Sequence, residues 1–367
     1  MSRVKFGDVV KDVKINIDRL NNPYEYYVAG DHMDSEDLTI HRKGCFTTDD
    51  VGPAFIRVFK PGQILYGSRR TYLKKIAVAD FEGVCANTTF VFETKDPHAF
   101  EQRLLPFIML SKDFTTWSIA KSKGSTNPYV LFSDLADFEF ELPPLEEQKV
   151  LVDKLWAAYR LKEAYKKLLV ATDEMVKSQF IEMTTRSELN KKSIGEIAEV
   201  RTGSTPSRSN PEYWNGTHYW VSAQDMDNKY IYDTLEKITD KGYATCKVVP
   251  AGSILYVCRG SIGVMSINTM DCATNQSICT ATCKKGYNTE YLYYALKVAE
   301  KTIKKQGIGT SFKSLNQSAF SSIEILFPAI EIQDKFAAIA KQADKSKFEL
   351  KQCIENIDKV IKSLING

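Results

Sequence analysis

The stretch LPPLEEQKVLVDKL at residues 142–155 recurs in altered form as FPAIEIQDKFAAIA at residues 327–340. The two copies lie 185 residues apart (327 − 142), and the same offset pairs Gln148 with Gln333. Two prolines set a turn in the first copy, and the glutamates that follow them favour the N-terminus of a helix. The repeated stretch therefore predicts a helix that begins at the same place in each half of the chain.

The repeat continues upstream, where its offset changes as it would if the loops differ in length. PGQILYGSR from Pro61 matches AGSILYVCR from Ala251, and YYVAGDHMD from Tyr26 matches YWVSAQDMD from Tyr219. Runs such as GQILYGS, TTFVFET, HYWVSA and GSILYVC are rich in β-formers and bounded by Gly, Pro and Asp, whereas helical runs such as TEYLYYALKVAEKTIKKQG are fewer. Two half-chains with one order of elements are predicted.

The fold class that follows is α+β, with mixed α/β domains each followed by a long helix. The predicted boundaries are a first domain at 1–142, a first helical spacer at 143–185, a second domain at 186–326 and a second helical spacer at 327–367. In both spacers apolar residues fall at alternating steps of three and four, which is typical of a helix with an apolar seam. The simplest partner for each seam is the other helix in an antiparallel coiled coil, although each helix could instead pack only on its own domain. The predicted seam residues are Ala158, Leu161, Tyr165, Leu168, Ile339, Ala343, Leu350, Ile357 and Val360.

Composition indicates the class of protein but does not identify its function. The chain has 367 residues, a formal charge of +3 and a hydrophobic fraction of 43%, which suits a globular protein and permits a polyanionic partner without requiring one. No apolar run reaches the ~20 residues of a membrane helix, and the N-terminus lacks a signal core, so a cytoplasmic protein without membrane contact is expected. Eight cysteines without a signal peptide are expected to be reduced, and Cys272, Cys279 and Cys283 lack the spacing of a zinc site, so no metal is predicted.

Basic and hydroxyl side chains gather in the loops of both halves. YGSRRTYLKK places tyrosines among arginines and lysines, and RTGSTPSRSNPEYW combines arginines with Ser and Thr. Arginine can read guanine bidentately, whereas hydroxyls and Gly-rich backbone suit phosphates. A solvated basic loop or a helix cap explains any one of these alone more simply. The loops KGSTNPYV at 123–130 and IGTSFKSL at 308–315 carry more weight, because both keep Gly, two hydroxyls and a basic residue just before the helix.

At this point the chain resembles the specificity subunits of Type I restriction-modification systems over essentially its whole length. ELPPLEEQ and LFPAIEIQ resemble the opening of that family's conserved helices, and KGSTNP and GIGTSF resemble its GS/T loops. IGEIAEVRTGSTPSRSNPEYWNGTHYWVSAQDM resembles the opening of one of its recognition domains. The second copy departs from the pattern at Ala329 and Ile332, which bears only on how that helix begins.

The resemblance implies a subunit without catalysis of its own, in which each recognition domain reads one half of a bipartite double-stranded DNA target and the helices set the unread spacer. It implies two modification subunits, which methylate adenine using S-adenosylmethionine, and restriction subunits that use ATP and Mg, whereas this chain needs no cofactor. From residue type and the resemblance together, the predicted DNA contacts are Arg69, Arg70, Lys74, Gly124, Ser125, Thr126, Arg201, Thr205, Ser207, Arg208, Gln224, Arg259, Gly309, Thr310, Ser311 and Lys313.

Two other functions remain open from the sequence. NNPY at Asn21 and TNPY around Asn127 resemble the motif of amino-methyltransferases, but both lack its second proline and no GxG turn follows a plausible first strand. A protein-interaction scaffold, with tandem domains on a helical spacer, is compatible with the same pattern. Strong salt dependence of binding to duplex DNA would separate the DNA-binding function from the scaffold.

Overall fold

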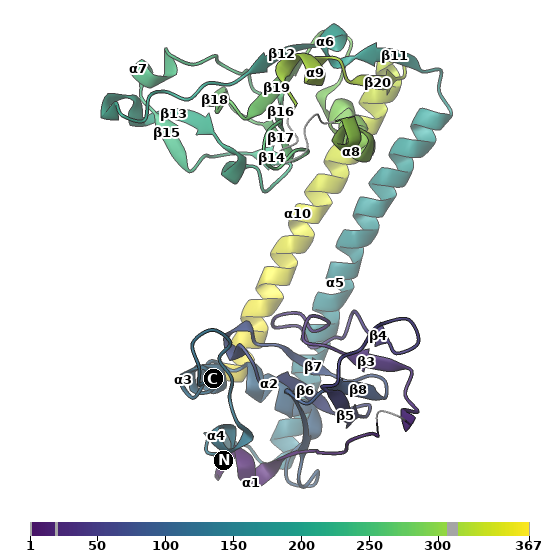
Figure 1. The fold of residues 1–367 in the computed structure, drawn as a ribbon, viewed down its shortest axis with the longest axis vertical. Helices are drawn as coiled ribbons and strands as arrows, with labels where there is room; N and C mark the ends of the chain where they lie inside the picture. The colour runs from purple at the N-terminus through teal and green to yellow at the C-terminus, as the bar shows by residue number, and fades with distance from the viewer. Residues whose placement is uncertain (1, 19–20, 307–314, 367) are drawn as a thin grey trace. The chain divides into compact units, whose positions relative to one another are not determined.

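The computed structural model describes residues 2–18, 21–306 and 315–366, and for 301–306 it describes the backbone alone. The chain divides into two compact units (Figure 1). The first comprises Met1–Lys167 with Lys351–Gly367, and the second comprises Leu168–Leu350. This division cuts through both long helices, so each unit contains a part of each helix. The domain boundaries expected from the sequence stay a prediction.

The first unit holds a four-stranded antiparallel sheet of order β2-β9-β6-β7, and a second sheet of order β4-β3-β8-β5 in which β3 and β8 run parallel. The largest buried cluster lies between the first sheet, the short helices and the start of α5, and includes Phe6, Phe92 and Phe114. The elements are β1 (Ser2–Lys5), α1 (Phe6–Val9), β2 (Val10–Asp12), β3 (Tyr26–Val28), β4 (Gly44–Cys45), β5 (Phe55–Phe59), β6 (Ile64–Gly67), η2 (Thr71–Leu73), β7 (Ile76–Val78), β8 (Gly83–Ala86), β9 (Thr89–Thr94), η3 (Gln102–Leu104), α2 (Leu105–Leu110), α3 (Lys112–Ala120), α4 (Phe132–Ala136), β10 (Glu139–Leu142) and α5 (Leu145–Thr185).

The second unit repeats this plan, with a five-stranded sheet of order β12-β19-β16-β17-β14 and a three-stranded sheet of order β15-β13-β18. Its main core lies between the larger sheet, α8 and the two long helices. The elements are β11 (Asn190–Ser193), α6 (Ile194–Ile197), β12 (Ala198–Thr202), η4 (Pro211–Tyr213), β13 (Trp214–Val221), η5 (Ala223–Asp225), β14 (Tyr230–Ile231), β15 (Glu236–Ile238), α7 (Asp240–Tyr243), β16 (Ile254–Val257), β17 (Met265–Asn268), β18 (Cys272–Thr274), β19 (Ile278–Cys283), α8 (Thr289–Gln306), α9 (Gln317–Ser321), β20 (Glu324–Phe327) and α10 (Ile330–Asn366).

The repeat seen in the sequence is a repeat of structure. In each copy the first strand pairs with the strand that leads into the long helix, so that Lys5 lies opposite Glu139 and Ser193 lies opposite Glu324 (324 − 139 = 185). The runs GQILYGS, TTFVFET, HYWVSA and GSILYVC all contribute strands, and the predicted helix from Thr289 is α8. The predicted fold class, α+β with a long helix after each domain, is confirmed.

The repeated glutamine closes the turn before each helix. Gln148 is buried, and its side-chain amide donates to the carbonyls of Pro143 and Ala99 while its Oε1 accepts from the Glu101 amide. Gln333 is equally buried and likewise donates to a proline carbonyl five residues before it, at Pro328. The conserved spacing of Pro and Gln between the copies therefore reflects one buried hydrogen-bonded turn used twice.

The two long helices pair antiparallel within each unit. In the first unit Lys162 of α5 forms an ion pair with Asp358 of α10 at 2.5 Å. In the second unit Lys347 of α10 forms an ion pair with Asp173 of α5 at 2.8 Å. Both residues of the second pair lie 185 positions from those of the first (347 − 162 and 358 − 173). The same contact is therefore made twice, with the two helices exchanging roles.

The apolar seam lies beside the row expected from the sequence. On α5 the buried apolar side chains are Val152, Leu155, Tyr159, Val176 and Phe180. Among the predicted seam residues, Ala343 is buried, Ala158 and Ile357 pack at the edge of the core, and Tyr165, Ile339 and Leu350 are half-buried. Leu161, Leu168 and Val360 are instead 46%, 49% and 52% exposed. The inward face is displaced because each helix packs on its own domain as well as on the other helix, so a simple heptad does not identify the buried row.

No helix among the described residues is long and apolar enough to cross a membrane.

Candidate nucleic-acid interface

Two loops of the first unit are fastened together by their backbones. Residues 68–75 connect β6 to β7, and residues 123–130 follow α3. The Arg70 amide donates to the carbonyl of Pro128 at 2.6 Å, and the Val130 amide donates to Ser68 at 3.0 Å. The sequence predicted contacts in both loops, and the structure brings them into one surface.

The side chains of these loops form a polar and aromatic surface, here called the loop patch. Tyr72 and Tyr129 are 53% and 40% exposed, and Tyr129 pairs with Arg69 through an isolated β-bridge. Among the described residues, no hydrogen-bond partner is found for the side chains of Arg69 and Arg70. The same holds for the hydroxyls of Ser125 and Thr126. Guanidinium groups, hydroxyls and exposed aromatic rings are the groups that bind phosphates and bases. The loop patch consists of the exposed residues Arg69, Arg70, Tyr72, Ser125, Thr126 and Tyr129.

The backbone at this patch is held in an uncommon conformation. Arg70 and Lys74 both have positive φ, at 51° and 47°, and Gly124 has φ of 91°. In the second copy the position that corresponds to Arg70 is Gly260 (260 − 70 = 190), with φ of 80°. The turn requires a left-handed residue there, which glycine supplies at little cost and arginine does not. Backbone strain of this kind clusters at functional sites, which favours a role for the Arg70 side chain.

The side chain of Lys74 is paired with the carboxylate of Glu36. Its ammonium group is ion-paired with Glu36, and that hydrogen bond lowers the pKa of the Glu36 carboxyl below its ordinary value. The lysine is half-buried. The charge of Lys74 is therefore already paired within the protein, whereas Arg69 and Arg70 present their charges to solvent.

The second unit places Arg259 where the first unit places Arg69. Arg259 is exposed two residues after the end of β16, and the Leu315 amide donates to the carbonyl of Cys258, as the Val130 amide donates to the carbonyl of Ser68 in the first unit. The predicted contacts Gly309, Thr310, Ser311 and Lys313 lie outside the described residues.

The remaining predicted contacts of the second unit differ in how freely they can bind. Arg208 stacks on Trp214, with its guanidinium carbon 3.7 Å from the ring centroid, and forms a bidentate ion pair with Glu236. Arg201 is ion-paired with Glu199 and donates to the carbonyl of Val248. The hydroxyls of Thr205 and Ser207 bond to Gln276 and Ser209, whereas Gln224 is exposed with no side-chain partner among the described residues. Arg201 and Arg208 are therefore neutralised by neighbours that the sequence did not suggest.

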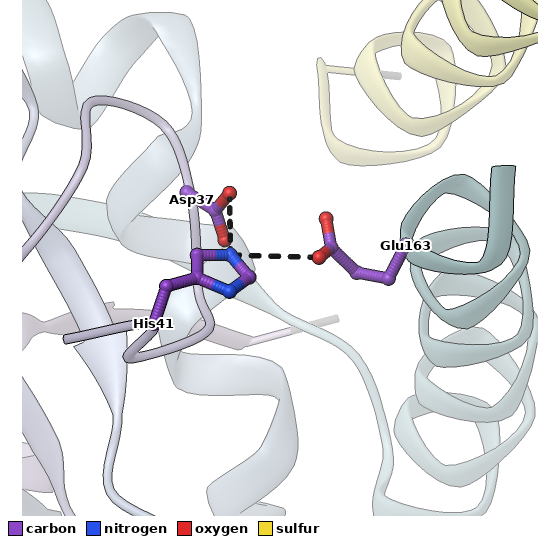
Figure 2. Close-up of side chains that lie close together, drawn as sticks. All are labelled: Asp37, His41 and Glu163. Atoms are coloured by element: carbon purple, nitrogen blue, oxygen red, sulfur yellow. Dashed lines mark hydrogen bonds and ion pairs between the residues drawn. The ribbon is translucent and has the colours of Figure 1, made fainter. Parts of the chain in front are cut away.

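A separate group of potential metal ligands has a different explanation. Asp37, His41 and Glu163 bring their ligand atoms within 4.8 Å of one another (Figure 2). The ammonium group of Lys166 lies 2.8 Å from Asp37 and 2.9 Å from Glu163 and so already balances the two carboxylates. Burial alone would raise the pKa of Asp37, but hydrogen bonds from Lys166 and Tyr159 outweigh it and lower that pKa to about 2. The group fits an ion-paired contact between the domain and α5 better than a metal site.

Comparison with known proteins identifies the family. The profile of the family described as "Type I restriction modification DNA specificity domain" matches residues 19–169 and again residues 186–359. The chain belongs to this family.

The curated relatives of this specificity-domain chain carry matching names. It is 33% identical over 183 residues to the Type I restriction enzyme MjaIX specificity subunit of Methanocaldococcus jannaschii, and 30% identical over 186 residues to the HindI specificity subunit of Haemophilus influenzae. These matches cover 48% of this chain and 42% and 40% of the relatives, so they span about two-fifths of each relative's length.

A solved structure has the same fold along the whole chain. The Type I restriction-modification S subunit from M. genitalium matches with a TM-score of 0.65 over 99% of this chain and 94% of that one, at 13% identity. A second structure, from work on complex assembly and conformational transition of a Type I restriction-modification system, matches with a TM-score of 0.56 at 19% identity. At these identities the likeness concerns the fold.

Proposed function

We propose that this chain is the sequence-specific DNA-binding subunit of a Type I restriction-modification complex. Each domain reads one half of a bipartite target in double-stranded DNA, and the chain itself carries no catalytic step. The observation that supports this best is the loop patch, in which exposed arginines, hydroxyls and tyrosines are held together on a strained turn. The family membership and the names of the relatives point the same way.

The long helices set the number of unread base pairs between the half-sites. α5 has 41 residues and α10 has 37, and at ~1.5 Å per residue these correspond to ~60 and ~55 Å. A rigid paired helix resists a change in the spacing of what it connects. The spacer should therefore be a fixed property of this protein.

The helices also recruit the partners that perform the chemistry, which are the modification subunits and the restriction subunits. Large apolar side chains remain exposed on one face of α5, among them Leu168 and Met175, which are seven residues apart and 49% and 46% exposed. Apolar side chains gathered on one stretch of an exposed helix favour a protein partner. The S-adenosylmethionine, ATP and Mg that the reactions need would bind to those partners.

Binding to duplex DNA at several salt concentrations tests this function. The complex with its modification subunits should lose affinity steeply as salt rises, because each neutralised phosphate releases counterions. A chain with Arg69→Ala and Arg259→Ala should bind more weakly and with a shallower salt slope, whereas Arg160→Ala on the exposed face of α5 should change neither. Affinity independent of salt and of the two loop arginines would instead favour the protein-interaction scaffold.

A further inference from the structure

The two domains contact their helices through corresponding positions whose chemical roles are exchanged. For this comparison the first module is residues 2–142 and the second module is residues 190–327. YYVAGDHMD and YWVSAQDMD are 193 residues apart (219 − 26), and the same offset pairs Asp37 of the first module with Tyr230 of the second (230 − 37). On the helices, Tyr159 corresponds to Asp344 (344 − 159 = 185).

In the first unit the module supplies the carboxylate and the helix supplies the hydroxyl. The Tyr159 hydroxyl donates to Oδ1 of Asp37 at 2.6 Å, and the same hydroxyl accepts from the Leu38 amide at 2.8 Å. Lys166 of the same helix donates to the second oxygen of Asp37 at 2.8 Å. The module is therefore the anionic side of this contact.

In the second unit the module supplies the hydroxyl and the helix supplies the carboxylate. Tyr230 donates to Glu290 of its own module at 2.6 Å and lies 3.3 Å from Oδ2 of Asp344 on α10. Lys229 of the module is 2.6 Å from the same Asp344 oxygen. Lys229 is also 2.6 Å from Glu290 of the module, so the module supplies a lysine, a carboxylate and the hydroxyl, and the helix supplies the carboxylate of Asp344.

Both contacts are buried, so a mismatch would not be relieved by solvent. The side chain of Asp37 is 8% exposed, and those of Lys229 and Asp344 are 12% and 15% exposed. Removing the partner of a buried charge is costly, and placing two like charges together is costlier. The lysine that donates to Asp37 does not distinguish the two helices. Lys166 of α5 corresponds to another lysine, Lys351, on α10 (351 − 166 = 185).

We propose that the reciprocal pairs Asp37–Tyr159 and Tyr230–Asp344 form a placement code, which lets each module dock on its own helix and disfavours docking on the other. On the wrong helix, Asp37 would face the carboxylate of Asp344, while Tyr230 would face the hydroxyl of Tyr159 and Lys229 would keep only Glu290 as a carboxylate partner. Side-chain chemistry thereby matches each module to the helix that follows it in the chain.

Point variants of the full chain test the first contact. Tyr159→Asp should lower the melting temperature by about 5 °C and speed hydrogen exchange at the Leu38 amide, which donates to the Tyr159 hydroxyl. Adding Asp37→Tyr rebuilds the pair found in the second unit and should recover at least half of both losses. Tyr159→Phe is the control, since it removes the hydroxyl without adding charge, and Asp37→Tyr should rescue it less. A double variant no more stable than Tyr159→Asp alone would overturn the code.

A module exchange tests the code as a whole, and it does not rely on a tyrosine fitting into the first contact. In the exchanged chain, residues 6–138 and 194–323 stand in each other's places. These ranges are the two modules without their first and last strands, which stay with the helices. It should melt at a lower temperature than the natural chain, and Tyr159→Asp together with Asp344→Tyr on its helices should raise that temperature. An exchanged chain as stable as the natural one, or one that gains nothing from the two helix substitutions, would refute the proposal.

Discussion

At the scale of single residues, Gln148 and Gln333 show why the repeated motif contains a glutamine. The sequence alignment detected the pair, but it could not tell a surface contact from a buried support, because glutamine is usually exposed. In the structure both side chains are buried and bond to the backbone around the turn that precedes the helix. The motif is therefore a requirement of the fold.

Replacing Gln148 tests that role. Gln148→Met keeps the volume but leaves the Glu101 amide and the carbonyls of Pro143 and Ala99 without their partner, so it should cost about 2–3 kcal/mol of unfolding free energy. Gln352→Met, at an exposed position of α10, serves as the control and should cost less than ~0.5 kcal/mol. Urea unfolding measures both, and equal losses would argue against a structural role for Gln148.

Asp37 should make stability depend on pH in the acidic range. Its pKa is lowered from 3.8 to about 2, so its stabilising contribution is present above pH ~4 and is lost as the pH falls toward 2. The natural chain should lose about 2 kcal/mol more than Asp37→Asn between pH 5 and pH 2. Urea unfolding at a series of pH values measures the difference, and parallel curves for the two proteins would contradict it.

Arg70 offers a substitution whose effects on stability and binding should have opposite signs. Arg70→Gly places a glycine where the backbone is left-handed and so removes the strain that arginine carries there. It should leave the unfolding free energy unchanged or raise it by up to ~1 kcal/mol. It should nevertheless weaken DNA binding several-fold by removing an exposed guanidinium. Thermal unfolding and fluorescence anisotropy measure the two effects. If binding is unaffected, Arg70 has no part in the interface.

The candidate contacts were only partly accessible from the sequence. Arg69, Arg70 and Arg259 were predicted from residue type, and the structure leaves all three exposed. Tyr129 was missed, although the sequence shows an aromatic residue directly after Asn-Pro, a dipeptide typical of turns. The pairing of Arg208 with Glu236 could not be foreseen, since the two residues are 28 positions apart and meet only when β13 and β15 pair.

At the scale of elements, helix lengths and starts followed closely from the absence of Gly and Pro and from the repeated turn. The face that each helix buries did not, because a heptad pattern assumes one partner and these helices have two. Tyr159 illustrates this: it lies outside the predicted seam, yet it is buried against the first module. The exposed Leu161 and Leu168 belong to the face that remains open.

The helices as spacers can be tested by lengthening them. Inserting seven residues into α5 adds ~10 Å, or ~3 base pairs, and should lengthen the spacer or abolish recognition while leaving both half-sites the same. Inserting a heptad at the corresponding place in α10 as well restores the pairing of the helices and is the matched control. The target read by the assembled complex gives the result, and an unchanged spacer would show that the helices do not set it.

At the scale of the whole molecule, the sequence supported two copies of one α+β domain with a helix after each, and the structure and the family profile agree. The bases that are read could not be derived from one sequence, because recognition depends on which side chain reaches which base edge. The ion pairs Lys162–Asp358 and Lys347–Asp173 were also hidden from the sequence, although they obey the repeat offset, because charged residues on a helix are usually solvated.

Mapping methylated adenines tests whether the two domains read the two halves of one bipartite target. The chain would be expressed with its modification subunits, and methylated adenines would be located across a genome by single-molecule sequencing. Two short fixed blocks separated by a constant number of unread bases are the predicted result, and Arg69→Ala and Arg259→Ala should each relax one block. A continuous motif, or a spacer that varies from site to site, would show that the two domains do not read two halves at a fixed separation.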